Sequence, residues 1–452
     1  MLRSVLVLSL FIPALARAEA PKPPTDLVDY VAKDDKAFAW KKGNAIETPG
    51  GVAFELELTS QRWQNITWTH KVQVFVPKDV KPQATMVLWN QGGSPNAASG
   101  LLGLEIAKKV GAPVAFLYGI PNQPLFDGKR EDALIAETFV QYLATKDSSW
   151  PLLFPMVKSL IKAMDALQAF AKEEWKFDVT HFVVTGASKR GWTSWLTAAT
   201  GDKRVKAIAP LVIDTLNMPV QMKNQVAAFG KPSLMIKDYT ERNLVPIPDS
   251  GEGQKLWKMV DPWVYRDQIA VPKMIINGAN DPYWPLDALN SYWDDLKGEK
   301  HMLYVPNAGH DLREVDKDGK KQLLPERALN TLSAFCKCQI FGKTMPKSSV
   351  KYSATEDGKV SMQVFMEGTL KSQRVWFSEC ESRDFRKARW TEKTLSSTSG
   401  GGAVQISGPV STTLTLKVPQ SGFSAAFVET QFEVDGLVFP LSTQLRIFEA
   451  KK

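Results

Sequence analysis

The chain has 452 residues, of which 44% are hydrophobic and 23% are charged, and its formal net charge is +8 at pH 7. This length exceeds what one small hydrophobic core serves, so it predicts two domains. The excess of Lys and Arg is spread thinly, without basic blocks or interleaved aromatic residues. The composition therefore argues against a nucleic-acid partner.

Residues 1–18 have the pattern of a secretory signal, with a basic start, an apolar run from Val5 to Leu15 and a small-residue cleavage site ending at Ala18. We expect cleavage near Ala18 and an exported protein, periplasmic or secreted. The alternative, a membrane anchor, is disfavoured because this run is too short to cross a bilayer. No later segment offers about 18 uninterrupted apolar residues, so no membrane span is expected.

From Val52 onward, segments typical of strands alternate with segments typical of helices. The predicted strands are VAFELEL, HKVQVFVP, ATMVLWN, PVAFLYG, HFVVTG, VKAIAPLVI, KMIING and HMLYVP. Apolar residues at helical spacing predict helices over 130–144 and 156–175, and a helix from about 325 to 340 is expected to close this region. Two antiparallel strands leading into such an alternation predict an α/β-hydrolase fold, a mostly parallel sheet with helices on both faces, over residues 19–345.

Two stretches of this region depart from the alternation. Residues 214–267 carry turn signals between two predicted strands, which predicts a partial cap over the site or a long connection. Before the first strand, the proline-rich PKPPTDLVDYV predicts an extended leader.

Residues 346–452 have a different texture. About seven short segments with period-two alternation, separated by Gly, Ser and Asp turns, predict a small β-sandwich of immunoglobulin or fibronectin type. These predicted strands are SVKYSAT, KVSMQVFMEG, RVWFSEC, AVQISG, STTLTLKV, SAAFVETQFEV and LVFPLSTQLRIFEA. The chain has three cysteines, Cys336, Cys338 and Cys380. In an oxidising compartment they allow one bridge, such as Cys338 to Cys380 between the domains, or three unpaired thiols that are mostly buried.

The segment HFVVTGASKRGWTSWL predicts a strand, a sharp turn at Ser188 and a helix. α/β-Hydrolases present a nucleophilic serine in this way, normally within G-x-S-x-G. Here Gly186 is in place, but the second glycine is Gly191, one position late. Ser188 is therefore either a nucleophile or a residue that caps the helix.

A serine nucleophile requires a base that is oriented by a carboxylate. Of the four histidines, only His310 follows the last predicted strand of the sheet, in YVPNAGHDL, whereas the others lie at strand starts or too early. Asp281 ends the preceding strand, in KMIINGANDPYWP. The order Ser188, Asp281, His310 is that of an α/β-hydrolase triad. Taken singly, Asp281 is also explained as a turn residue before a proline and His310 as an exposed loop residue.

The oxyanion hole is expected to use backbone N–H groups near Ser188. The candidates are Lys189, which follows the nucleophile, and the residues Gln91, Gly92 and Gly93 in LWNQGGSPN after the third core strand.

Three further residues are candidates for contact with substrate. Arg190, beside the nucleophile, is a candidate for binding a substrate carboxylate or an oxyanion. Its alternative is a structural ion pair, for instance with Asp214 or Asp132. Trp192 and Trp284 lie beside the predicted site elements and are candidates for an aromatic pocket, or for core packing.

Whole blocks of the chain, among them IPNQPLFDGKREDALIAETFVQYL, FVVTGASKRGWTSWLTAAT and MVDPWVYRDQI, resemble the PhoPQ-activated pathogenicity-related protein family. The resemblance extends from about Trp40 into the C-terminal β domain. It implies an α/β-hydrolase fold followed by an immunoglobulin-like domain in a bacterial, exported protein. Within these blocks, Asn122, Gln123 and Arg130 are candidates for binding substrate. Alternatively, the acidic residues that follow Arg130 simply favour the start of a helix.

The sequence therefore predicts an exported serine hydrolase that cleaves a small-molecule ester or a peptide through an acyl-enzyme. The alternative is a catalytically weak or inactive hydrolase scaffold that acts as a secreted binding or signalling protein, and the displaced Gly191 is the feature that favours it. No metal site or cofactor is expected, because the chain has no H-E-x-x-H, C-x-x-C, P-loop or G-x-G-x-x-G motif. No motif indicates an oligomeric state.

Overall fold

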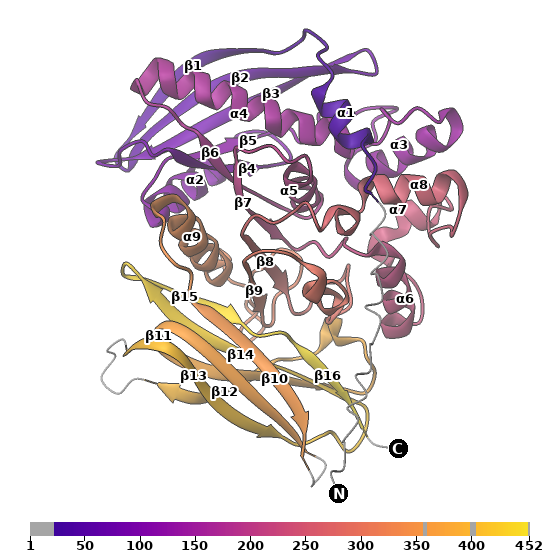
Figure 1. Ribbon diagram of the computed structural model, residues 1–452, viewed down its shortest axis with the longest axis vertical. Helices are drawn as coiled ribbons and strands as arrows, with labels where there is room; N and C mark the ends of the chain where they lie inside the picture. Colours follow the sequence, from indigo (N-terminus) through magenta and orange to yellow (C-terminus); the bar gives the residue numbers. More distant parts are fainter. Residues whose placement is uncertain (1–21, 356–358, 398–403, 451–452) are drawn as a thin grey trace, which may run out of the picture.

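The computed structural model describes residues 22–355, 359–397 and 404–450. The predicted secretory signal, residues 1–18, lies outside the described residues. Figure 1 shows a sheet flanked by helices in the upper part of the molecule and an antiparallel sheet, formed by the C-terminal residues, below it.

The first sheet has nine strands, and most of them are parallel, as predicted. They are β1 (Ala39–Thr48), β2 (Gly51–Trp63), β3 (Ile66–Pro77), β4 (Thr85–Asn90), β5 (Val114–Leu117), β6 (His181–Ala187), β7 (Val205–Leu211), β8 (Lys273–Gly278) and β9 (Lys300–Val305). Their order is β1-β2-β3-β5-β4-β6-β7-β8-β9. The pairs from β1 to β5 along this order are antiparallel, and the pairs from β5 to β9 are parallel.

The N-terminal edge of this sheet corrects two predictions. Three antiparallel strands precede the parallel part, because β1 forms from AWKKGNAIET, where no strand was predicted. The exposed side chains of β1 give no alternating apolar pattern, and the strand is held by backbone pairing with β2. The predicted extended leader contains the helix α1 (Asp26–Ala32), whose Leu27 is fully buried.

Helices cover both faces of the sheet. They are α2 (Ala97–Val110), α3 (Glu131–Thr145), α4 (Leu153–Trp175), α5 (Lys189–Ala199) and α9 (Glu326–Phe341). Successive residues of β4 show the two faces, because Met86 and Leu88 pack with α4 and α5 while Val87 packs with α2 and α9. The helices predicted over 130–144, 156–175 and 325–340 are thus confirmed, whereas α2 was not predicted.

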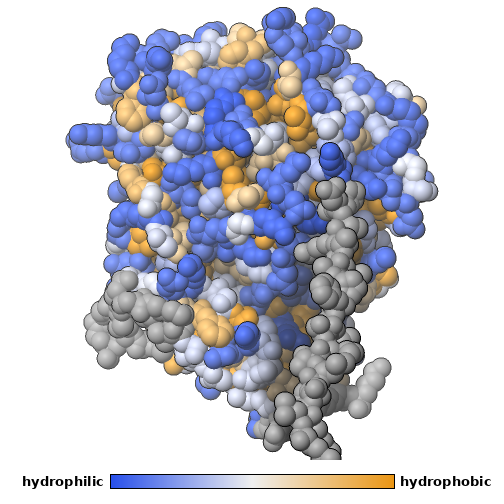
Figure 2. Space-filling model, viewed as in Figure 1, coloured by the Kyte–Doolittle hydropathy of each residue, from blue (hydrophilic) through white to orange (hydrophobic). Residues whose placement is uncertain are grey.

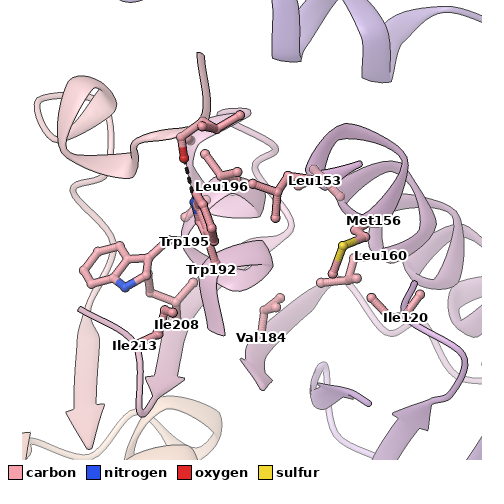
Figure 3. Packing of buried hydrophobic residues seen from close by; sticks show 14 of the residues in the cluster. Ile120, Leu153, Met156, Leu160, Val184, Trp192, Trp195, Leu196, Ile208 and Ile213 are labelled. Atoms are coloured by element: carbon pink, nitrogen blue, oxygen red, sulfur yellow. Dashed lines mark hydrogen bonds between the residues drawn. The ribbon is translucent and has the colours of Figure 1, made fainter. Parts of the chain in front are cut away.

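The core beneath α5 is densely packed (Figure 3). Trp195 and Leu196 of α5 are fully buried together with Val184 of β6 and Ile208 of β7. Leu160 of α4 belongs to the same cluster. This packing fixes the helix that starts directly after Ser188.

Residues 214–267 form a helical segment between β7 and β8. It contains α6 (Met218–Phe229), η1 (Leu234–Ile236), α7 (Lys237–Thr240), α8 (Gly251–Val260) and η2 (Pro262–Tyr265). Two further short helices, η3 (Ala288–Ser291) and η4 (Trp293–Asp295), follow β8. Both α7 and α8 contact α3, so this segment lies beside the parallel sheet, on the side of α3 (Figure 1).

The C-terminal residues form one connected antiparallel sheet of seven strands. They are β10 (Lys347–Ala354), β11 (Val360–Cys380), β12 (Thr391–Ser397), β13 (Val404–Leu416), β14 (Phe423–Val434), β15 (Leu437–Ser442) and β16 (Arg446–Glu449), with a short helix η5 (Phe385–Lys387) before β12. Two predicted strands merge in β11, where a register shift beside Gly368 replaces the expected turn. Two more merge in β13, and the predicted last strand divides into β15 and β16. The immunoglobulin or fibronectin type stays a prediction.

The two sheets share a buried boundary. α9 and β9 contact β15, and Arg327 of α9 donates to the fully buried Glu429 of β14 at 2.5 Å. All three cysteines are free thiols, with Cys336 and Cys338 buried, so the bridge between Cys338 and Cys380 is not formed.

The face of the molecule drawn in Figure 2 carries both hydrophobic and hydrophilic residues. Figure 2 shows hydrophobic residues in small groups among hydrophilic ones on this face. Within residues 22–355, 359–397 and 404–450, none of the helices combines the length and the apolar character that crossing a membrane requires.

Candidate active site

Ser188 lies in a strained turn between β6 and α5. Its backbone has φ 58° and ψ −128°, a conformation that non-glycine residues rarely adopt and that is found mainly where function requires it. The Ser188 side chain makes no capping hydrogen bond to α5. The helix-cap interpretation is therefore wrong, and the turn has the form of a nucleophile elbow.

The late glycine has a packing reason. A Cβ on Gly191 would lie 2.6 Å from Cγ2 of Ile213 and 3.1 Å from the carbonyl oxygen of Leu211, at the end of β7. A Cβ on Gly186 would lie 2.8 Å from Cβ of Arg190. Both glycines therefore let the first turn of α5 approach the sheet, while Arg190 occupies the position directly before Gly191.

The predicted acid and base lie together. Asp281, which is 7% exposed, follows β8, and its Oδ2 accepts a hydrogen bond from Nδ1 of His310 at 2.7 Å. Its Oδ1 accepts from the backbone N–H of Tyr283 at 2.8 Å, and the ring of Tyr283 stacks on the imidazole with centroids 4.3 Å apart. These contacts hold the imidazole in one orientation.

Nε2 of His310 is buried and has no hydrogen-bond partner among the described residues. His310 and Ser188 line the same cavity. A nitrogen in this position can accept a proton from a serine hydroxyl when substrate binds, since hydrogen bonds in unliganded sites are often not yet formed.

The other three histidines are held elsewhere. His70 is buried, with Nε2 2.9 Å from Oγ of Ser60 and Nδ1 3.1 Å from the carbonyl oxygen of Tyr118, and burial lowers its pKa to about 4. His301 contacts Glu299 at 2.7 Å, and His181 contacts Thr180 at 2.8 Å. Only His310 lines the cavity at Ser188.

The structure separates the four oxyanion candidates. The backbone N–H of Gln91 already donates to the carbonyl oxygen of Leu117 at 2.7 Å, so the prediction for Gln91 is wrong. In the described part of the chain, the amides of Gly92 and Gly93 donate no hydrogen bond, and that of Lys189 is at the free N-terminal end of α5. These three amides remain available to a ligand, but only Lys189 lines the cavity at Ser188, and Gly93 lines the second cavity described below.

Arg190 is engaged in a structural ion pair, but not with the predicted partners. Its two terminal nitrogens each donate to Glu131 at 2.6 Å, and its Nε donates to the carbonyl oxygen of Ile120 at 2.5 Å. Although burial opposes ionisation, the hydrogen bonds and charges of Arg190 and Lys189 lower the pKa of Glu131 to about 2. The prediction that Arg190 binds substrate is therefore wrong, because its donors are already used.

This ion pair supports the glycine loop. A Cβ on Gly92 would lie 2.1 Å from a terminal nitrogen of Arg190, so a side chain at this position would have to displace the guanidinium. The neighbouring Lys189 bridges Glu131 at 3.0 Å and Asp132 at 3.1 Å. The network thus links the residue after Ser188 to the loop that carries the other candidate oxyanion donors.

The cavity at Ser188 is mainly apolar and small, with a volume of about 40 Å³. Trp192 and Trp284 line it, as predicted, and Trp192 is fixed by a hydrogen bond from Nε1 to the carbonyl oxygen of Val260 at 2.6 Å, the dashed line in Figure 3. The segment 214–267 supplies the apolar wall over the site: Thr215, Met218, Ile236, Tyr239, Val245 and Trp257. The cavity also has one acidic residue, Asp132, which accepts from the Tyr239 hydroxyl at 3.1 Å.

The remaining substrate candidates lie in a different place. Asn122, Gln123 and Arg130 line a second, more open cavity of about 650 Å³ beside β2 and β3. Gln123 is also a structural partner, because its side chain both donates to and accepts from Glu131. The prediction that these three residues contact substrate at Ser188 is not supported by their placement.

Sequence reasoning missed the contributions of Asp132 and Tyr283 to the cavity. Asp132 was considered for a helix start and for a pair with Arg190, but its actual partners, Lys189 and Tyr239, come from distant segments. The run of aromatic residues after Asp281 was the available signal for Tyr283.

Comparison with known proteins adds a family match and a set of fold matches. A family model described as PhoPQ-activated pathogenicity-related protein matches residues 27–386. The chain is 31% identical over 444 residues to "Autocrine proliferation repressor protein A" of Dictyostelium discoideum. The aligned region covers 90% of this chain and 86% of that protein. Acetyl xylan esterase 1 from Thermoanaerobacterium sp. is 15% identical with a TM-score of 0.49, covering 71% of this chain and 95% of that one. An S-formylglutathione hydrolase from Agrobacterium tumefaciens is 14% identical with a TM-score of 0.43, covering 66% and 99%.

Proposed function

This chain belongs to the PhoPQ-activated pathogenicity-related protein family, and we propose that it is an exported serine hydrolase that cleaves an ester or amide bond through an acyl-enzyme intermediate. One observation carries the proposal. His310 is held by Asp281 at 2.7 Å with its second nitrogen free, and it lines the same cavity as Ser188, whose backbone is strained at φ 58°. Export rests on the predicted secretory signal.

In the proposed reaction, Oγ of Ser188 attacks the carbonyl carbon of the substrate while Nε2 of His310 takes the hydroxyl proton. Asp281 stabilises the imidazolium through its hydrogen bond to Nδ1. The tetrahedral intermediate collapses, the carbonyl forms again, and the leaving group departs with the proton from His310. A water molecule then attacks the acyl-enzyme by the same route, with His310 again as the base, and releases the acid.

The oxyanion of the intermediate is assigned to backbone amides. The N–H of Lys189, at the start of α5, and those of Gly92 and Gly93, on the loop after β4, donate no hydrogen bond within the described residues. Such preset donors stabilise the charge that develops in the transition state, and each one is worth about 3 kcal/mol in other hydrolases. The ion pair of Arg190 with Glu131 keeps the glycine loop against α5, so its contribution is structural.

The cavity favours a substrate with an apolar group at the scissile bond. Its wall is formed largely by aromatic and aliphatic side chains, and burial of such a group contributes about 25 cal/mol for each Å² removed from water. The charged groups at its edge, Lys189 and Asp132, are already paired with each other. A neutral ester or amide therefore fits this site better than a charged one.

Labelling with a fluorophosphonate probe tests the proposal. The mature protein is expected to be labelled at Ser188, located by peptide mass spectrometry, and the labelling is expected to disappear in Ser188→Ala and in His310→Ala. Ser94→Ala is the matched control, because this exposed serine lies on the glycine loop outside the cavity at Ser188. Absence of labelling in the folded wild type would instead support a binding or signalling protein on an inactive scaffold.

A further inference from the structure

A loop of the C-terminal sheet reaches the two loops that carry the acid and the base. We call residues 381–390, between β11 and β12, the clamp loop. The side-chain nitrogen of Asn280, the neighbour of Asp281, donates to two carbonyl oxygens of the clamp loop, those of Phe385 at 3.0 Å and Ala388 at 2.8 Å. The residue next to the acid is thus held by the other sheet.

The base loop is held by the same segment. Asn307, three residues before His310, donates from Nδ2 to the carbonyl oxygen of Trp390 at 3.0 Å. Its Oδ1 accepts from the backbone N–H of Trp390 at 2.9 Å. This two-point bond fixes both the position and the orientation of the Asn307 amide.

The acid and base loops are also joined to each other. The backbone N–H of Asn280 donates to the carbonyl oxygen of Ala308 at 3.0 Å, and that of Ala279 donates to Val305 at 2.9 Å. Asn280 therefore connects three segments, because its backbone holds the base loop and its side chain holds the clamp loop.

The clamp loop is itself firmly anchored. Phe385 and Trp390 are each 1% exposed, and the Trp390 ring packs on Phe427 of β14 with centroids 5.3 Å apart. The guanidinium of Arg386 pairs with Asp384 and lies 3.8 Å from the ring centroid of Phe229, the last residue of α6. The same loop thus touches the segment that covers the cavity.

We infer that the C-terminal sheet is part of the catalytic apparatus, because the clamp loop fixes the spacing of Asp281 and His310 through the positioning residues Asn280 and Asn307. Misplacement of reacting groups by about 1 Å can cost roughly a hundredfold in rate, so two loops tied to one buried anchor keep the base where Ser188 needs it. The inference rests on the proposed hydrolase function for its effect on rate.

The test compares Asn280→Ala and Asn307→Ala with a matched control. Asn290→Ala removes an equivalent bond, from an asparagine side chain of the first sheet region to the carbonyl oxygen of Leu445 at 2.8 Å, without touching the acid or base loop. For hydrolysis of p-nitrophenyl acetate, kcat is expected to fall at least tenfold in each clamp variant, with KM within twofold of wild type. The control is expected to keep both constants within twofold. Asn307→Asp keeps the acceptor for the Trp390 N–H but places a carboxylate oxygen against the Trp390 carbonyl oxygen, so it is expected to lose activity as well.

A readout independent of turnover separates this inference from the proposed function. The proton between His310 Nδ1 and Asp281 is expected as a far-downfield ¹H NMR resonance that is absent in His310→Ala. It should shift or broaden in the clamp variants and stay unchanged in Asn290→Ala. If the wild type neither turns over ester nor reacts with fluorophosphonate, the proposed function fails, and the resonance alone decides the inference. Clamp variants that match Asn290→Ala in the resonance, or in kcat where the enzyme is active, would overturn the inference. If the alanine variants do not fold, Asn307→Asp supplies the same comparison.

Discussion

Asp281→Asn tests the proposed base with the smallest change of shape. In the wild type, Oδ1 of Asp281 accepts from the backbone N–H of Tyr283 at 2.8 Å, and Oδ2 accepts from His310 Nδ1 at 2.7 Å. The N–H of Tyr283 can only donate, so it selects the orientation in which the new amide oxygen replaces Oδ1. The new NH₂ group then points at Nδ1, where the carboxylate oxygen was.

The size of the effect follows from this geometry. An NH₂ group at Nδ1 requires that nitrogen to be an acceptor, which moves the proton to Nε2 and leaves no lone pair for Ser188. Restoring the active tautomer places two donors face to face in a buried site, at a cost of about 2–3 kcal/mol, and the charge-assisted bond to the imidazolium, worth about 2–3 kcal/mol, is lost as well. The sum of about 4–6 kcal/mol corresponds to a loss of roughly 10³–10⁴ in rate.

The assay is the second-order rate of fluorophosphonate labelling at Ser188, together with kcat/KM for p-nitrophenyl acetate. Both should fall by the same factor in Asp281→Asn. The control is Asp295→Asn, because the Asp295 carboxylate also accepts from a ring N–H, that of Trp263 at 3.0 Å, but lies outside the cavity. A loss smaller than tenfold in a folded Asp281→Asn protein would refute the role given to the acid.

Three further substitutions test the supports of the site. Gly191→Ala should destabilise the fold by about 1–3 kcal/mol in urea unfolding, because the new Cβ meets Ile213 at 2.6 Å; an unchanged midpoint would contradict the packing argument. Arg190→Met should lower the free energy of unfolding by about 2 kcal/mol in the same assay and slow fluorophosphonate labelling. The loss is limited because Glu131 keeps its ion pair with Lys189 and is partly exposed to solvent. Stability and labelling equal to wild type would show that the Arg190–Glu131 ion pair does not support the site. Burial lowers the pKa of His70 to about 4 in the folded protein, whereas an unperturbed histidine has a pKa near 6.5. Between these two pH values the unfolded chain binds a proton at His70 that the folded chain does not. The free energy of unfolding should therefore fall by about 3 kcal/mol as the pH drops from 6.5 to 4. In His70→Gln the free energy of unfolding should depend less on pH across this range. An unchanged slope would show that the pH dependence comes from other groups.

The sheet and the placement of the candidate residues Ser188, Asp281 and His310 could be predicted, because both follow from local patterns in the sequence. A parallel strand buried on both faces is a short apolar run, and the residue that follows it lies at one edge of the sheet. Ser188, Asp281 and His310 each follow such a run. That rule needs no knowledge of side-chain packing, and the structure places the last two within hydrogen-bond distance.

The partners of charged residues could not be predicted, because they depend on which side of a helix faces a distant segment. Arg190 has Glu131 as its partner, whereas Asp132 and Asp214 were the expected ones. Glu131 starts α3 with a backbone φ of 54°, which is not helical, and its side chain reaches Arg190 while that of Asp132 reaches Lys189 and Tyr239. The backbone bond that removes Gln91 from the oxyanion candidates is likewise invisible in the sequence.

The contacts of the clamp loop were also beyond sequence reasoning. Asn280 and Asn307 lie in predicted turns, and the side chain of an asparagine in a turn normally forms a hydrogen bond with backbone groups close to it in the sequence. Their actual partners lie 83 to 108 residues away in the chain. The segment that forms β11 was predicted as two strands, and no role was predicted for the loop that follows it.

The displaced glycine is explained by how the first turn of α5 meets its neighbours. The position that must be small is the one that faces the end of β7, and here that position is 191, where a Cβ would meet Ile213. Position 190 is rotated by about 100° from it, toward the glycine loop and Glu131, and a long side chain fits there because Gly186 and Gly92 make room. The G-x-S-x-x-G spacing therefore replaces the small residue expected two positions after Ser188 with an arginine that lies against the candidate oxyanion loop. This makes the altered spacing compatible with a working elbow and removes the main sequence argument for an inactive scaffold.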